Sequence, residues 1–102
     1  MDKRFSQNTF ELASKVNDEN SFLNFIGAIA DDRLDELRKE LEDPSSPYGP
    51  GANGWENWSI ETFLDAAKAW GEATKNGTSY YDPPDNPWTR AAQIICAGKF
   101  YE

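Results

Sequence analysis

Apolar side chains recur along most of the chain at spacings of three and four residues, which is the pattern of amphipathic helices. The longest stripe consists of Phe22, Ile26, Ile29, Leu34, Leu37 and Leu41. The opposite face of the same segment holds Asp32, Asp35, Glu36, Lys39 and Glu40. This distribution predicts a surface helix over residues 20–43 that begins with Ser21 as its N-cap and buries the apolar stripe.

Three other segments follow the same rule. An arm over residues 1–19 contains a short helix over roughly 8–17. Another helix follows the N-cap Ser59 and covers residues 59–76. The last helix opens at Asn86-Pro87 and covers residues 87–100. Their apolar positions are Phe10, Ala13 and Val16, then Phe63, Ala67 and Trp70, then Trp88, Ala91, Ala92, Ile95 and Phe100. Because no stretch alternates apolar and polar residues for long enough to make a strand, we predict an all-α fold. The expected architecture is a small single-domain helical bundle over residues 1–102, with three main helices and a short N-terminal one.

Two interruptions separate the predicted helices. Residues 44–58 form a long Pro/Gly loop, and residues 77–86 form a second loop that contains Asn and Pro. The glycine-rich part, residues 48–54, does not fit a phosphate-binding loop, because no lysine lies between Lys39 and Lys68. We therefore expect a structured turn sequence there, and Asn76-Gly77 as the left-handed stop of the preceding helix.

The amino-acid composition excludes several catalytic and metal-binding mechanisms. The chain has 18 acidic and 10 basic residues, a net charge of -8, no histidine and a single cysteine, Cys96. Catalytic triads, imidazole metal ligands, thiolate zinc clusters and intrachain disulfides are thus excluded, and the negative charge argues against nucleic-acid binding. The first residues are polar and no apolar run follows them, so we expect neither a secretory signal nor a membrane helix, but a cytoplasmic protein with a reduced, buried thiol.

One acidic string deserves a chemical hypothesis. Asp31, Asp32 and Asp35 form an Asp-Asp-x-x-Asp sequence, and carboxylates in this spacing on a helix can hold magnesium ions. The competing interpretation is a solvated helix face whose charges are balanced by Arg33, Arg38 and Lys39. We favour the solvated face and predict neither a metal ion nor another cofactor, because no second acidic motif accompanies the first.

The most unusual cluster is aromatic. Trp55, Glu56, Asn57 and Trp58 stand at the entrance to a predicted helix, and Tyr80 and Tyr81 follow its end. Such a group can form an anionic, aromatic surface that anchors a protein partner or holds a cation. Trp55 and Trp88 are expected to be structural, with Trp88 packed on Trp70 and Asn57 bonded to backbone. Trp58 and one of the two tyrosines are expected to be exposed.

From residue 54 onward the chain resembles a known family. The residues that carry the resemblance are Gly54-Trp55-Glu56-Asn57, Ser59-Ile60-Glu61, Phe63-Leu64-Asp65-Ala66-Ala67, Trp70, Tyr80-Tyr81, Asn86-Pro87-Trp88, the closing Ala97-Gly98-Lys99-Phe100-Tyr101-Glu102 and, further upstream, Ser21-Phe22-Leu23-Asn24-Phe25 to Ala30-Asp31-Asp32. They resemble a family of small acidic bacterial proteins of unknown function, whose marks are Trp-Glu-Asn before a helix and a terminal Tyr-Glu. The resemblance covers about residues 20–102, and it implies a bacterial, all-helical single domain without an assigned reaction.

The residues favour binding over catalysis. Our leading hypothesis is a non-enzymatic interaction module that meets a basic protein partner, for example an immunity or antidote protein that masks a cationic toxin. One alternative is a binding module for a cationic small ligand or peptide, held by Glu56, Trp58 and nearby tyrosines. The other is a magnesium-dependent enzyme that uses Asp31, Asp32 and Asp35, which we rank last because no nucleophile or base accompanies them.

Overall fold

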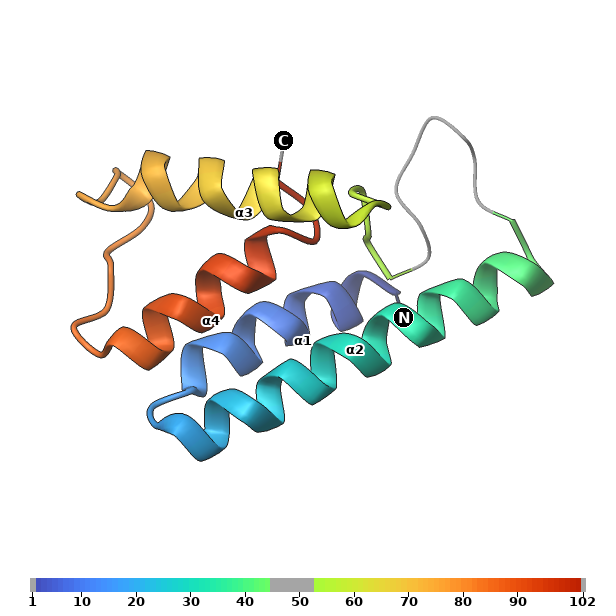
Figure 1. Cartoon of the computed structure of the whole chain (residues 1–102), viewed down its shortest axis with the longest axis horizontal. Helices are drawn as coiled ribbons and strands as arrows, with labels where there is room; N and C mark the ends of the chain where they lie inside the picture. Colours follow the sequence, from blue (N-terminus) through green and yellow to red (C-terminus); the bar gives the residue numbers. More distant parts are fainter. Residues whose placement is uncertain (1, 45–52, 102) are drawn as a thin grey trace.

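Helices make up all the regular secondary structure in the described part of the chain, which comprises residues 2–44 and 53–101 of a computed structural model, with side chains from Thr9 onward (Figure 1). The helices are α1 (Asp2–Lys15), α2 (Glu19–Glu42), α3 (Ile60–Thr74) and α4 (Pro87–Ala97). The all-α prediction is confirmed. The loop predicted over residues 44–58 lies mostly outside the described residues, because residues 45–52 do not belong to them.

Helix α1 corrects the predicted N-terminal helix of residues 8–17. It spans 14 residues, from Asp2 to Lys15. The prediction counted only the apolar positions from Phe10 to Val16. Polar residues are compatible with a helix when neither Gly nor Pro weakens it, and neither occurs before Lys15.

The helix ends follow local side-chain chemistry. Asp18, not the predicted Ser21, caps α2: its carboxylate accepts from the Ser21 backbone N–H at 2.8 Å, and Ser21 Oγ accepts from the Asp18 N–H at 3.1 Å. Ser21 is therefore the N3 residue of a capping box. The predicted caps Ser59 and Asn86 are confirmed, with Pro87 in the first turn of α4. Gly77 follows α3 with a φ of 85°, as the Asn76-Gly77 stop requires.

Helix α4 contacts each of the other three helices, and α2 and α3 lie on opposite sides of α1 and α4 (Figure 1). Buried between them are Ala13, Val16, Phe25, Ile29, Trp55, Ala92 and Cys96, surrounded by Phe10, Phe22, Phe63, Ile95 and Phe100. Polar contacts pin α1 to α4, because Gln93 Nε2 donates to Ser14 Oγ at 3.1 Å and Thr89 Oγ1 donates to the Val16 carbonyl. None of the helices in these described ranges has an apolar stretch long enough to cross a membrane.

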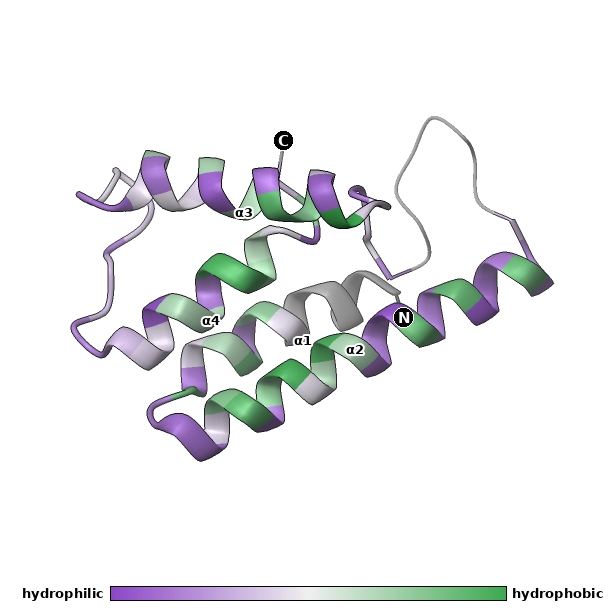
Figure 2. Ribbon diagram, in the orientation of Figure 1, coloured by the Kyte–Doolittle hydropathy of each residue, from purple (hydrophilic) through white to green (hydrophobic). Residues whose placement is uncertain are grey.

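The buried face of α2 differs from the predicted one. Its buried residues are Phe25, Ile29, Asp32 and Glu36, whereas Leu34, Leu37 and Leu41 of the predicted apolar stripe are 64%, 41% and 87% exposed. Figure 2 shows hydrophobic residues recurring along the whole of α2, including the C-terminal turns that project beyond α4. The prediction assumed that the apolar stripe faces the core. Instead, the core side of these turns carries carboxylates that have buried partners, described below.

The packing of Trp88 also differs from expectation. Its ring lies 5.3 Å from the ring of Phe22, not against Trp70, and its side chain is partly exposed. Trp70 contacts the rings of Phe10 and Tyr81, at 6.3 and 5.0 Å between ring centroids. Trp88 and Trp70 stand on different sides of α4, so each closes a separate edge of the core.

Two glycines of the α3–α4 interface give a matched prediction. A Cβ at Gly98 would stand 2.7 Å from the Phe63 carbonyl oxygen, whereas a Cβ at Gly71 would meet Ile94 at ordinary distances of 3.5 to 3.8 Å. We expect Gly98→Ala to lose about 1–3 kcal/mol of unfolding free energy, because backbone must move. Gly71→Ala should be neutral or stabilising by up to about 1 kcal/mol, since it removes a helix-interior glycine. Urea denaturation of both variants tests this, and equal effects would contradict it.

Candidate functional site

The segment that enters α3 is held against the core by Trp55. This side chain is 4% exposed, and its ring stacks on Phe63 at 5.9 Å between ring centroids. Its indole N–H donates to Asp32 Oδ2 at 2.9 Å. The structural role expected of Trp55 is therefore confirmed, and its polar atom is satisfied by a carboxylate of α2.

Asn57 joins the same segment to the C-terminal end of the chain. Its side-chain amide donates to the carbonyl oxygens of Gly98 and Tyr101, at 2.9 and 3.0 Å. The Glu56 backbone N–H donates to the Lys99 carbonyl at 2.9 Å. Asn57 is bonded to backbone, as predicted, but to residues more than 40 positions away rather than to a local turn.

The ring of Trp58 lies at the surface, where a side chain of α2 contacts it. The side chain is 45% exposed, as the sequence predicted. The Arg33 guanidinium lies 4.6 Å from the Trp58 ring centroid and 5.3 Å from that of Trp55, and it donates to the Trp58 carbonyl at 3.3 Å. A cation between two indole faces fixes the orientation of both rings. The aromatic surface is thus preorganised by a basic residue of α2.

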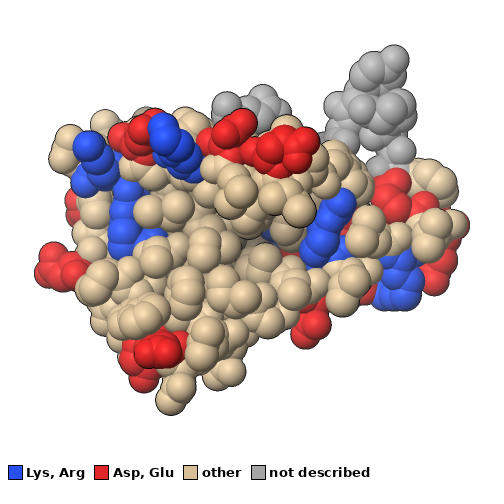
Figure 3. Space-filling view, viewed as in Figure 1, with Lys and Arg blue, Asp and Glu red and all other residues tan. Residues whose placement is uncertain are grey.

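An apolar hollow of about 340 Å³ opens beside Trp58. Its lining consists of Arg33, Trp55, Asn57, Trp58, Ser59, Ile60, Phe63 and Leu64. Ile60 and Leu64 project from the first turns of α3 and are 78% and 57% exposed. We call this hollow the Trp58 pocket. In Figure 3 a broad area without charged side chains lies between the helices, and acidic side chains gather along α3 at its edge.

The two tyrosines of the predicted cluster lie elsewhere. They follow the C-terminal end of α3, whereas Trp58 precedes its N-terminal end, so the whole helix separates them (Figure 1). Tyr80 is 99% exposed, as expected of one tyrosine. Tyr81 instead donates to Gln93 and lies 5.6 Å from the Arg90 guanidinium. The structure brings together Trp55, Glu56, Asn57 and Trp58, but not Tyr80 and Tyr81.

A buried ion pair lies directly behind the Trp58 pocket, and the sequence analysis missed it. Lys99 and Asp32 are both 0% exposed, and Lys99 Nζ lies 2.6 Å from Asp32 Oδ2. The same Asp32 oxygen accepts from Trp55, and Lys99 Nζ also lies 3.4 Å from Thr9 Oγ1. Burial of a charged pair is tolerated only when both partners are well bonded. The one available signal was Lys99 within an apolar C-terminal stretch.

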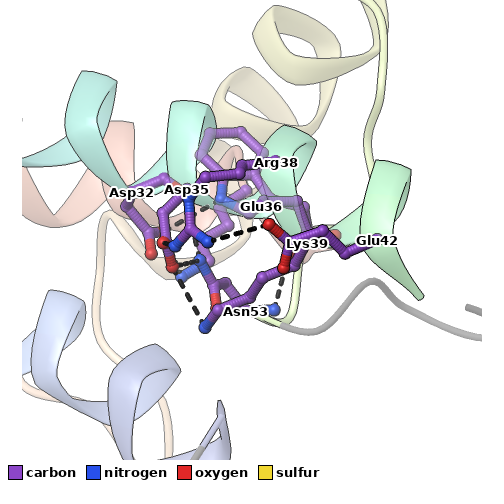
Figure 4. A network of polar contacts seen from close by, with 9 residues as sticks. Asp32, Asp35, Glu36, Arg38, Lys39, Glu42 and Asn53 are labelled. Atoms are coloured by element: carbon purple, nitrogen blue, oxygen red, sulfur yellow. Dashed lines mark hydrogen bonds and ion pairs between the residues drawn. The ribbon is translucent and has the colours of Figure 1, made fainter. Parts of the chain in front are cut away.

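Glu36 and Asn53 extend this buried network along α2 (Figure 4). Glu36 Oε1 accepts from the Asn53 backbone N–H at 2.6 Å, and the Asn53 amide donates to the Asp32 carbonyl and to Asp35 Oδ2, at 3.1 and 2.9 Å. Lys39 Nζ donates to Asn53 Oδ1 at 2.9 Å and pairs with Asp35 at 3.0 Å. The prediction that Asp32 and Glu36 belong to a solvated face was therefore wrong, since both are 0% exposed.

The carboxylates of the acidic string do not converge. Asp31 is exposed, Asp32 is buried against Lys99, and Asp35 pairs with Arg38 and Lys39. Within the described ranges, no group of three or more acidic, His or Cys side chains is placed to hold a metal ion. Of the three aspartates, Asp31 alone lies on a solvated helix face, as the second interpretation of the acidic string predicted.

The pKa values of two neighbouring carboxyls move in opposite directions. Burial raises the pKa of Glu36 above its usual 4.5, against the bond from Asn53. Bonds from Asn53 and Lys39 lower the pKa of Asp35 from 3.8 to about 2. A carboxyl whose pKa is raised in the native state makes the free energy of unfolding fall as the pH rises. A carboxyl whose pKa is lowered makes the free energy of unfolding increase as the pH rises.

This contrast predicts opposite pH profiles for two variants. The unfolding free energy of Glu36→Gln, relative to wild type, should increase as the pH rises above 4.5, because the variant has no proton to lose. That of Asp35→Asn should decrease relative to wild type as the pH rises from about 2 to 3.8 and beyond. Urea denaturation between pH 2 and pH 8 measures both profiles. Profiles of the same sign would contradict the assignment.

Cys96 is a structural thiol. It is 0% exposed, and burial raises its pKa above the usual 9.0. A raised pKa keeps the sulfur protonated and poorly nucleophilic. The expectation of a buried, unreactive cysteine agrees with this placement.

The fold and the site together define a small helical protein with an aromatic pocket at the start of α3, stabilised from behind by a buried charged network. The chain belongs to the family of unknown function DUF7660, whose model matches residues 18–102. The resemblance to a family of unknown function is thereby confirmed. Comparisons with curated proteins and with solved structures gave no match.

Proposed function

We propose that this protein is an interaction module that binds another protein at the Trp58 pocket and catalyses no reaction. The observation that carries the proposal is an indole held by Arg33 at the edge of an apolar hollow, next to the exposed Ile60 and Leu64. Tryptophan anchors in preorganised apolar pockets dominate the binding energy of many interfaces. The other residues that line the hollow are mostly apolar and offer no general base.

The partner that fits this surface is a basic protein. The chain carries a net charge of -8. Glu61 and Asp65 follow Ile60 and Leu64 directly in sequence and are exposed, so carboxylates border the apolar contact surface. Long-range attraction would steer a cationic partner, and the aromatic anchor would retain it. In its most specific form, the proposal is an immunity or antidote protein that masks such a partner in the bacterial cytoplasm.

Affinity capture from the native host tests the proposal. Immobilised wild-type protein should retain a stoichiometric basic protein at low salt and less of it at high salt. Trp58→Ala should reduce capture at least about tenfold, since hot-spot truncation exceeds about 1.4 kcal/mol. Tyr80→Ala is the matched control, because it removes an exposed aromatic ring at the far end of α3. Failure to recover a basic protein, or equal capture by Trp58→Ala, would refute the proposal.

A small cationic ligand is the alternative, and the pocket geometry favours it less. The ring faces of Trp55 and Trp58 that could hold a cation already receive Arg33, and Tyr80 and Tyr81 are too far along α3 to complete a cage. Titration of tryptophan fluorescence with polyamines and basic peptides separates the two functions. A saturable response to polyamines that Trp58→Ala abolishes would favour the small ligand.

A further inference from the structure

The outer side of α2 carries a line of exposed apolar side chains. Leu23, Ile26, Leu34, Leu37 and Leu41 are 57%, 38%, 64%, 41% and 87% exposed, and the exposed Ala30 completes the line. At 100° per residue, these six positions lie within an arc of about 80°, whose centre is about 130° around the helix from that of the buried residues of α2. Contiguous exposed apolar surface of this kind marks an interaction site. We call it the α2 stripe.

The described part of the chain leaves the α2 stripe uncovered. The side of α2 that packs on α1 and α4 is the side of Phe25 and Ile29, and α3 lies across the molecule (Figure 1). No charged residue stands within the stripe between Leu23 and Leu41, because Asp31, Arg33 and Arg38 lie along its flanks. The stripe therefore needs an apolar occupant that is itself helical or extended.

The stripe is self-complementary. Its members are placed almost symmetrically about residue 32, with Leu23 and Leu41 nine positions away, Ile26 and Leu37 six and five, and Ala30 and Leu34 two. We propose that α2 pairs antiparallel with α2 of a second copy of this chain, across a two-fold axis near residue 32. In such an isologous interface, Leu23 of one copy meets Leu41 of the other, and each Ala30 meets a Leu34. Every layer is apolar, and the central layers match a small side chain with a large one.

Gly27 adds an independent observation. It stands in the interior of α2, beside the stripe, and nothing lies within 4 Å of the position that its Cβ would occupy. Glycine in a helix interior is unfavourable, so its presence there calls for a packing reason. The described residues of one copy supply none. A second helix that approaches closely would use the missing side chain.

The available area suits a modest dimer. The α2 stripe runs over about 27 Å from Leu23 to Leu41, and a helix is about 10–12 Å across, so half of the lateral surface over this length is about 450 Å² per copy. Two copies would bury about 900 Å², which is the size of a weak, transient interface. We expect a dimer that dissociates at micromolar concentrations, not an obligate one.

Charge gives the dimer a signature of its own. Each copy has a net charge of -8, and the flanking Asp31 residues of the two copies approach each other near the axis. Added salt screens this repulsion, so the dimer should tighten as salt rises. Capture of a basic partner at the Trp58 pocket should weaken under the same change, which separates the two interactions.

Sedimentation velocity of the full chain over micromolar to millimolar concentrations tests the dimer. Wild type should shift from monomer to dimer, and Leu34→Glu should raise the dissociation constant about tenfold or more, because it buries a carboxylate in an apolar layer. Asn24→Glu is the control, since it adds the same charge on the flank of α2 and should dimerise like wild type. A wild-type monomer at all concentrations, or an unchanged dimer of Leu34→Glu, would overturn the proposal.

Disulfide crosslinking tests the antiparallel arrangement. Cys96 is buried, so a variant with one introduced cysteine offers one accessible thiol. A mixture of Leu23→Cys and Leu41→Cys should form the mixed disulfide. Leu41→Cys alone should not crosslink, because its two copies would stand about 27 Å apart, beyond the reach of a disulfide. Crosslinking of Leu41→Cys with itself would refute the antiparallel pairing. Trp58→Ala should dimerise like wild type, so this proposal and the proposed function can fail separately.

Discussion

Replacement of Asp32 by alanine should lower the free energy of unfolding by about 3–5 kcal/mol, because it removes the carboxylate that pairs with the buried Lys99 ammonium. It also removes the acceptor of the Trp55 indole N–H. A small domain has only about 5–15 kcal/mol in total, so the variant should be close to unfolding at 37 °C. Urea denaturation followed by circular dichroism measures the loss.

The adjacent residue supplies the control for this prediction. Asp31→Ala removes the same side chain from an exposed position of the same helix and should change stability by no more than about 0.5 kcal/mol. Lys99→Met should be destabilising like Asp32→Ala. The double variant Asp32→Asn/Lys99→Met removes both charges, retains an acceptor for Trp55, and should lose less than the two single losses combined. Equal stability of Asp31→Ala and Asp32→Ala would show that the ion pair does not stabilise the fold.

The second large effect is expected at Trp55. Trp55→Ala should lose about 3–5 kcal/mol of unfolding free energy, because it removes a large buried ring that contacts Phe63, Arg33 and Lys99. Trp58→Ala should lose under about 1 kcal/mol, since its ring is half exposed. Thermal unfolding of both variants tests this contrast. If Trp58→Ala proved the more destabilising of the two, Trp58 would be a structural residue and would lose its role as an anchor.

Helix positions could be predicted from the sequence because local chemistry determines them. Ser59 and Asn86 bond their own first turns, and Gly77 adopts the left-handed conformation that ends α3. These signals act within four residues, so they need no knowledge of the fold. The same reasoning placed the N-cap of α2 at Ser21 instead of Asp18, because both residues take part in one capping box.

The orientation of α2 could not be predicted in this way. Apolar periodicity indicated a core side through Leu34, Leu37 and Leu41, whereas the core side of those turns holds Asp32 and Glu36. Their burial depends on Lys99 and Asn53, which lie 67 and 17 residues away in the chain. A carboxylate can be recognised as buried only when its partner is known. The Trp58 pocket could not be predicted for the same reason, because Arg33 contacts Trp58 although the two residues are 25 positions apart in the sequence.

The burial of Cys96 has a practical consequence for measurement. Because the thiol is fully enclosed, an alkylating reagent can reach it only when the core opens. The rate of its modification in native buffer therefore reports how often that opening occurs, without denaturant and without an added probe. Cys96 is thus a built-in probe of local opening at the α1–α4 interface.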